Sequence, residues 1–219
     1  EIEMTPAARL SAAIQILDRI LGGTPAEQAL VNWARASRFA GSGDRHAIRD
    51  LVFDALRCRR SFAALGGGET GRGLILGGLR AAGEDVNALF TGEGHAPANL
   101  TEADTGREAQ GFETHDIPDW IGPQMQADLG DDFAAIMASL RHRAPVYLRV
   151  NLRRATLPQA QAALAEDGIE TRQNPLSPTA LEVTAGARKI AGSEAYTAGL
   201  VELQDAASQA VIDMLPLID

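Results

Sequence analysis

The stretch RHRAPVYLRVNLRR, residues 141–154, decides the fold class of the second half of the chain. It holds five arginines, one histidine and no carboxylate, although acidic residues outnumber basic ones by nine in the whole chain. At its centre, residues 146–150 alternate apolar and polar side chains, the period-two pattern of a β-strand with one buried face. The stretch therefore predicts a strand flanked by arginines in an otherwise acidic protein.

The alternation places Tyr147, Arg149 and Asn151 together on the face opposite the apolar residues. An aromatic ring, a guanidinium group and an amide on one exposed face suit stacking and polar contacts with RNA. Salt screens such charges beyond roughly 8 Å, so they act only on a ligand that they touch, and we expect a phosphate backbone. A surface strand that is merely polar on its outer face is the alternative.

The sequence around this strand predicts a mixed α and β domain. Helices are expected at 118–129, 132–141 and 157–167, strands at 169–172, 180–184 and 200–203, and a last helix at 206–215. A strand that feeds a helix next to a short apolar tail usually marks the edge of a larger sheet. We therefore expect that the natural chain continues beyond Asp219.

The first hundred residues have a helical pattern. Thr-Pro pairs at 5–6 and 24–25 are start signals for two helices, the second of which should end near Phe39 or Gly41. Asp44 is expected to cap a third helix, and glycines 66–68 to break the chain before shorter helices that end near Phe90. The aperiodic, acidic residues 91–116 are predicted to be a linker.

The third helix carries a first group of arginines, whose members are Arg45, Arg49, Arg57, Arg59 and Arg60. Aspartates are interleaved with them, so a solvated face with pairs four residues apart is as good an interpretation as a ligand-binding surface. The group 141–154 lacks such aspartates. Both interpretations of the first group stay open at this point.

The composition narrows the classes of protein. A net charge of −9 in 219 residues argues against a protein that coats nucleic acid, and leaves room for a local site. With Cys58 as its only cysteine, the chain can form no internal disulfide. The absence of a long apolar segment or leader peptide leads us to expect a cytoplasmic protein that begins at Met4, with residues 1–3 as an added remnant.

Other motifs predict no chemistry in this chain. GGGETGRG, residues 66–73, has the glycine spacing of a phosphate loop, but Arg72 and Gly73 replace the required Lys and Ser/Thr, so a helix break is the better interpretation. Cys58 lies at a helix C-terminus, which disfavours a thiolate, and is interpreted as structural. The four histidines show no spacing typical of metal ligands. We therefore expect no catalytic residue and no metal site.

Three segments resemble a known family. GSGDRHAIRDLVFDALRCRRSF, residues 41–62, resembles the third helix region of NusB-like domains. APVYLRVN (144–151) and LVELQDAASQAVIDML (200–215) resemble the Sun (Fmu) family of ribosomal RNA cytosine-C5 methyltransferases. The resemblance implies an all-α NusB-like RNA-binding domain at 4–90, a linker at 91–116, and a small α+β RNA-recognition subdomain at 117–203, ferredoxin-like and of βαββ type. Residues 204–219 would then lead into the methyltransferase core.

The resemblance also implies a division of labour. The family's glycine-rich S-adenosylmethionine loop and Pro-Cys motif have no counterpart here, so the whole protein would use that cofactor whereas this fragment would be inactive and bind none. The expected partner is small-subunit ribosomal RNA, with no DNA or membrane and with a monomeric chain. Gln204, Asp205 and Ser208 would lie beside the cofactor-binding sheet. The expected RNA contacts are Arg45, Arg49, Arg57, Arg59, Arg60, Arg141, Arg143, Tyr147, Arg149, Asn151, Arg153 and Arg154.

Two rival functions remain. A stand-alone NusB-like RNA-binding protein of transcription or ribosome assembly would have no chemistry of its own. A protein-interaction module would present the arginine strand to an acidic partner. RNA affinity measured against salt concentration separates this last possibility from RNA binding, because phosphate contacts make the logarithm of affinity fall linearly with the logarithm of salt.

Overall fold

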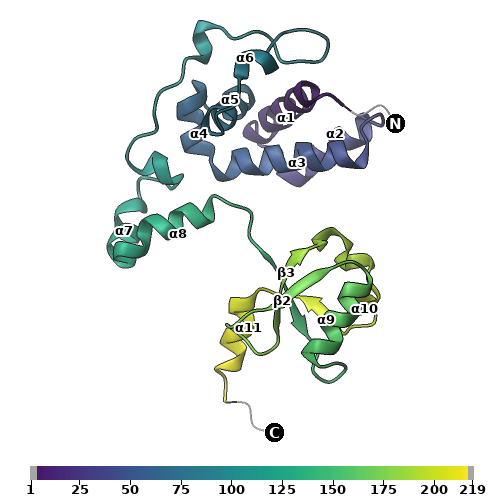
Figure 1. Ribbon diagram of the computed structural model, residues 1–219. Helices are drawn as coiled ribbons and strands as arrows, with labels where there is room; N and C mark the ends of the chain where they lie inside the picture. Colours follow the sequence, from purple (N-terminus) through teal and green to yellow (C-terminus); the bar gives the residue numbers. More distant parts are fainter. Residues whose placement is uncertain (1–3, 217–219) are drawn as a thin grey trace. The chain divides into compact units, whose positions relative to one another are not determined.

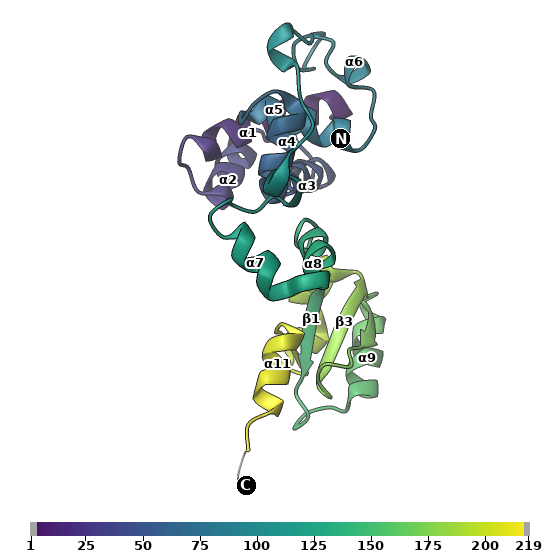
Figure 2. The same ribbon diagram turned by 90° about the vertical axis from the view of Figure 1, so that its left-hand side faces the viewer.

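The computed structural model describes residues 4–216, which form two compact units that meet between Arg143 and Ala144. The first, the helical unit, is drawn in purple to teal in Figures 1 and 2, and the second, the sheet unit, in green to yellow. Each unit has its own hydrophobic core, so each is described by itself. No helix within the described residues is long and apolar enough to span a bilayer.

The helical unit consists of short helices joined by turns. Its α-helices are α1 (Pro6–Leu21), α2 (Ala26–Ala36), α3 (Ser42–Arg57), α4 (Arg59–Gly66), α5 (Gly71–Ala81), α6 (Val86–Leu89), α7 (Gly122–Leu129) and α8 (Phe133–Leu140). Its 3₁₀ turns are η1 (Glu102–Asp104), η2 (Gly111–His115) and η3 (Gly130–Asp132). The core lies where α1, α3 and α5 meet, around fully buried Ile16, Ile48 and Leu74.

The start of α1 matches its expectation, whereas Pro25 and not Thr24 is the N-cap residue of α2, which has no side-chain cap. The end of α2 and the start of α3 also differ in detail. The Thr5 hydroxyl accepts a hydrogen bond from the Ala8 N–H, so it caps α1 as predicted. Helix α2 ends at Ala36, three or more residues before the predicted end, because the chain makes a turn there. Asp44 is not the N-cap of α3 but its third residue, and its carboxylate accepts the Gly41 N–H at 3.1 Å.

The glycine-rich break after α4 is a tight helix junction. A Cβ atom on Gly73 would lie 2.0 Å from the Gly68 carbonyl oxygen, and one on Gly77 would lie 1.9 Å from that of Phe62, so only glycine permits this approach of α4 and α5. The N-terminus of α5 is already occupied, since the Gly71 N–H donates to the Asp18 carboxylate at 2.7 Å. A carboxylate of the chain itself thus fills the place that a phosphate takes in a phosphate loop.

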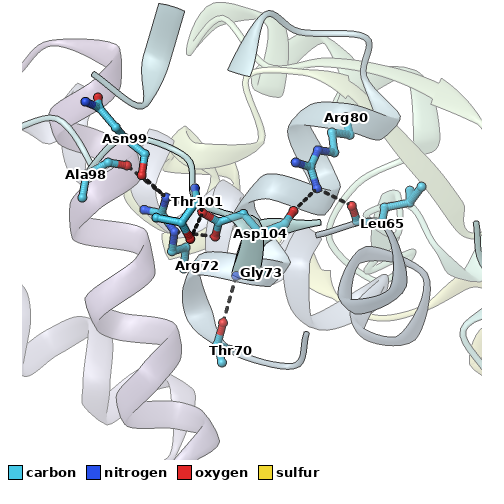
Figure 3. Close-up of polar contacts among 9 residues, drawn as sticks. All are labelled: Leu65, Thr70, Arg72, Gly73, Arg80, Ala98, Asn99, Thr101 and Asp104. Atoms are coloured by element: carbon cyan, nitrogen blue, oxygen red, sulfur yellow. Dashed lines mark hydrogen bonds and ion pairs between the residues drawn. The ribbon is translucent and has the colours of Figure 1, made fainter. Parts of the chain in front are cut away.

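Residues 91–116, the expected linker, make polar contacts with the helices of the helical unit at several points along their length. Arg72 on α5 forms an ion pair with the buried Asp104 at 2.7 Å and donates to the Ala98 and Asn99 carbonyls at 3.0 Å (Figure 3). Arg80 donates to the Asp104 carbonyl at 2.8 Å and to that of Leu65 at 2.7 Å. The segment has no hydrophobic periodicity, and polar contacts such as these, together with the packing of Leu100 and Phe112, attach it to the helices.

The hydrogen bonds from Arg72 to Asp104 have an electrostatic consequence. They lower the pKa of this carboxyl from 3.8 to about 2, with the Thr101 N–H as a further donor at 2.8 Å. The folded protein therefore stabilises the ionised form of Asp104. A charged pair of this kind orders the loop that contains Thr101 in a way that exposed salt bridges do not.

The sheet unit has the βαββαβ order of a ferredoxin-like fold. Its elements are β1 (Val146–Val150), α9 (Leu157–Glu166), β2 (Glu170–Gln173), β3 (Ala180–Ala185), η4 (Ala187–Gly192), α10 (Glu194–Thr197), β4 (Val201–Leu203) and α11 (Ala206–Asp213). The sheet is antiparallel with strand order β2-β3-β1-β4, which places β1 in its centre. The sequence missed η4 and α10, and the α+β class is confirmed.

Strand β1 is the structural centre of this unit. Leu148 and Val150 are buried against Ala160 and Leu164 of α9, while α11 lies on the other side of the sheet (Figure 1). The register pairs Leu148 with Leu181 of β3 and with Leu203 of β4. Both faces and both edges of β1 are therefore fixed, and the residues that directly follow Val150 begin from a rigid support.

Candidate nucleic-acid interface

The loop after β1, residues 151–154, is held in a tight turn by Asn151. The Asn151 carbonyl accepts the N–H groups of Arg154 and Ala155 at 2.9 and 3.0 Å, and its side-chain oxygen accepts that of Arg153 at 3.2 Å. Its side-chain amide donates to the Gly199 carbonyl at 3.2 Å. The side chain of Asn151, an expected RNA contact, is thus hydrogen-bonded within the fold. The three residues that follow it in the turn are exposed. We call residues 151–154 the arginine loop.

The two arginines of this loop carry charges that the chain does not neutralise. Arg153 and Arg154 are both exposed, and neither forms an ion pair with any carboxylate among residues 4–216. Arg154 donates to the Ala198 carbonyl at 2.6 Å, which orients its guanidinium group and leaves its charge uncompensated. Two exposed cations on a hydrogen-bonded turn, one of them oriented by a carbonyl, form a suitable contact for phosphate groups.

A groove of about 510 Å³ runs beside this loop, between β1 and α11. Arg149, Asn151 and Arg153 line it from β1 and the loop, and Gln204 and Ile212 line it from the opposite side. Expected residues from two distant parts of the chain therefore meet at one place. We call this cavity the β1 groove.

A buried amide forms the floor of the β1 groove. The Gln209 side chain is 2% exposed, donates to the Leu148 and Gln204 carbonyls, and accepts the Thr179 hydroxyl at 2.8 Å. Every polar atom of this amide has a partner, so it fixes α11 to the end of β1. Neither Gln209 nor Thr179 was among the site residues expected from the sequence. The one available signal was a glutamine on the buried face of the last helix, three residues after Ala206.

The outer face of the sheet is less basic than the sequence suggested. Arg149 forms an ion pair with Glu202, its register partner on β4, and Arg172 of β2 pairs with Glu182 of β3 at 2.8 Å. Tyr147, half-buried, lies opposite Glu182 in the register. Tyr147 and Arg149 do share the predicted face, but carboxylates from neighbouring strands accompany them, because strand pairing brings together residues that are distant in the sequence.

Arg141 and Arg143, at the start of the arginine-rich stretch 141–154, belong to the helical unit. Arg141 forms an ion pair with Asp116 at 2.8 Å and donates to the Ser61 hydroxyl at 3.1 Å. Arg143 lies 3.5 Å from the Asp50 carboxylate. The apparent continuity of the arginine group therefore ends at Ala144, where one compact unit gives way to the next.

The first arginine group is divided between two helices, contrary to the expectation of a single one, because α3 ends at Arg57 and α4 begins at Arg59. Most of its members are ion-paired. The pairs are Arg49 with Glu27, Arg57 with Asp54, Arg59 with Glu69, and Arg60 with Asp119. The hydrogen bonds from Arg49 hold the pKa of Glu27 below its usual range, and those from Arg60 to Asp119 raise the pKa of Arg60. Arg45 alone of the group has no such partner within the described chain.

The residues expected beside a cofactor shape the start of α11. Asp205 is its N-cap, and one carboxylate oxygen accepts the N–H groups of Ala207 and Ser208 at 2.8 and 3.4 Å. The Gln204 N–H donates to the Tyr147 carbonyl at 3.2 Å, which extends the pairing of β4 with β1. These hydrogen bonds fix the start of α11 beside β1.

A known domain family matches a segment that spans the boundary between the two compact units. Residues 117–188 match the family model described as Methyltr_RsmF/B-like, ferredoxin-like domain. The ribosomal RNA small subunit methyltransferase B of Xanthomonas campestris pv. campestris is 33% identical over 100 residues, which are 46% of this chain and 23% of that protein. The crystal structure of PH0851 has a similar fold, with a TM-score of 0.60 and 16% identity over 94% of this chain and 54% of that one.

These matches cover only part of each related protein. The chain matches about a quarter of the curated relative and spans about half of the solved structure. At 16% identity, the likeness to PH0851 concerns the fold alone. The family match and the curated relative together confirm that this chain resembles the N-terminal part of the Sun (Fmu) family of ribosomal RNA methyltransferases.

Proposed function

We propose that this chain is the RNA-binding N-terminal portion of an S-adenosylmethionine-dependent ribosomal RNA (cytosine-C5) methyltransferase, and that it positions small-subunit ribosomal RNA in the cytoplasm. The helical unit would be NusB-like, the chain monomeric, and neither DNA nor a membrane a partner. The curated relative, whose name states that it is a small-subunit ribosomal RNA methyltransferase, supports the choice of RNA.

One observation carries the proposal: the arginine loop presents Arg153 and Arg154 without carboxylate partners among residues 4–216. In a chain of net charge −9, guanidinium groups that remain unpaired on a rigid turn attract a polyanion locally. Phosphate contacts of this kind fix the register of an RNA strand and carry no sequence information. The half-buried Tyr147 on the adjacent sheet face adds a surface on which a base can stack.

We propose that residues 4–216 take no direct part in the transfer of the methyl group. When bound, S-adenosylmethionine would supply the methyl group. Cys58 has no part in the reaction, because burial raises the pKa of its thiol and its sulfur donates to the Arg141 carbonyl at 3.8 Å. The described residues would act by holding RNA in place, so removal of the arginine loop's charges should reduce RNA binding and leave the fold unchanged.

The test measures binding of a short single-stranded ribosomal RNA segment to the full chain by fluorescence anisotropy. We expect the double substitution Arg153→Ala/Arg154→Ala to weaken RNA binding by about tenfold or more, because it removes charge-assisted hydrogen bonds to phosphate groups. Arg172→Ala is the matched control, because this arginine is also exposed but forms an ion pair with Glu182. Equal affinities of the double variant and the unsubstituted chain would contradict the proposal.

A further inference from the structure

The helical unit contains a second cavity, which the RNA contacts discussed above do not use. It is a groove of about 810 Å³ between α1, the end of α2 and the loop that carries His95. We call it the α1–α2 groove. All of its lining residues lie within the helical unit, so it is complete without the sheet unit.

The walls of the α1–α2 groove combine apolar and aromatic side chains with polar ones. The polar lining residues are Thr5, Ser11, Gln15, Ser37 and His95. Small side chains of α1, Ala8 and Ala12, form one wall, and Trp33 borders the groove from α2. Phe39, in the turn after α2, stands at the rim with 69% of its surface exposed. An exposed aromatic ring at the mouth of a groove offers a face on which a flat ligand can stack.

Three arginines lie close to Phe39 in the sequence and carry positive charge to this part of the helical unit. Arg35 belongs to α2, Arg38 shares the turn with Phe39, and Arg45 belongs to α3, and all three are exposed. None of the three forms an ion pair with a carboxylate of the described chain. The neighbouring carboxylates are engaged elsewhere, Glu27 with Arg49 and Asp44 with Arg9.

We propose that the α1–α2 groove binds single-stranded RNA, with one unpaired base stacked on Phe39 and directed toward Trp33, and the flanking phosphates against Arg35, Arg38 and Arg45. An apolar peptide would satisfy the groove but would leave three guanidinium groups unused. Single-stranded nucleic acid satisfies both, since bases stack on aromatic side chains while the backbone follows a positive surface. The inference rests on RNA as the ligand of the proposed function and adds a base-binding contact to it.

The test uses the full chain with Trp120→Phe, which leaves Trp33 as the only tryptophan of the two in the sequence. A short single-stranded RNA is titrated while Trp33 fluorescence and RNA anisotropy are recorded, and the same RNA as a duplex is titrated in parallel. We expect saturable quenching by the single strand and not by the duplex, whose bases are stacked on one another. Equal quenching by both would overturn the proposal.

Substitutions then separate stacking from charge. Phe39→Ala is expected to weaken single-strand binding by about 5- to 150-fold, the usual effect of losing one base–aromatic stack. Val31→Ala on α2, which removes a side chain that is 44% exposed, is the matched control and should leave the affinity unchanged. Arg38→Ala should lower the slope of log affinity against log salt by about 0.7.

The outcomes distinguish this inference from the proposed function. If the Phe39→Ala and Val31→Ala variants bind RNA with equal affinity, the α1–α2 groove does not bind RNA and the proposal is wrong. This conclusion holds even if the groove binds another protein. If the double substitution at Arg153 and Arg154 still weakens binding in that case, the proposed function stands alone. Because Phe39 is exposed, its loss should leave the thermal unfolding curve unchanged, which shows that a weaker affinity does not come from misfolding.

Discussion

The arginines along α3 and α4 and those of the arginine loop have the same side chain but different surroundings. Arg49 and Arg60 are neutralised by Glu27 and Asp119, residues that lie 22 and 59 positions away in the sequence. Arg153 and Arg154 have no such partner within the described residues. The number of arginines in a short sequence segment therefore does not measure the positive charge available to a ligand. The carboxylates that neutralise such arginines can come from distant parts of the sequence.

The largest expected effect concerns stability and separates structural arginines from free ones. Asp104→Asn removes the ion pair with Arg72 and should destabilise the helical unit by about 1.5–3 kcal/mol, the usual worth of hydrogen bonds to a charged group. Arg153→Ala/Arg154→Ala should change the unfolding free energy by less than about 0.5 kcal/mol. Urea denaturation followed by circular dichroism measures both. Equal destabilisation of the two variants would remove the distinction.

The same ion pair predicts an acid dependence. The pKa of Asp104 falls from 3.8 to about 2 on folding, so its contribution to stability is fully present above pH 3.8 and is lost as the pH falls toward 2. Asp104→Asn should therefore lose less stability over this pH range than the unsubstituted chain does. Parallel slopes of unfolding free energy against pH would show that this carboxyl has an ordinary pKa in the folded protein.

A smaller effect is expected when a paired arginine is released. Glu202→Gln removes the partner of Arg149 on the sheet face that also carries Tyr147. The freed guanidinium group should raise RNA affinity by a few-fold, within the modest energies typical of exposed ion pairs. Glu27→Gln, which frees Arg49 on α3, is the comparison at a distant site. If neither substitution changes the anisotropy titration, pairing does not limit RNA contact at these positions.

The elements that follow from local rules were predictable. The alternation at 146–150 predicted β1, and the helix expected at 157–167 matches α9, because such signals lie within a few residues of the structure they determine. Helix α10 has four residues, too few for a hydrophobic period, and was missed. The first arginine group appeared to lie on one helix because nothing local marks the break at Cys58.

The candidate site was predictable only in its residue types. Its arginines could be named from the sequence, but which of them are neutralised depends on non-local pairs such as Arg149 with Glu202, which arise only when β1 and β4 align. The floor of the β1 groove depends likewise on Gln209 reaching the Leu148 carbonyl, 61 residues away. Both are consequences of tertiary packing.

The most direct test of the central claim is the salt dependence of RNA binding by the full chain. If Arg153 and Arg154 contact phosphates, their joint replacement by alanine should lower the slope of log affinity against log salt by about 1.4, about 0.7 for each contact with a single strand. The Arg172→Ala control should leave the slope unchanged, because Glu182 already neutralises that arginine. An unchanged slope in the double variant would contradict the assignment of the arginine loop as a phosphate-binding surface.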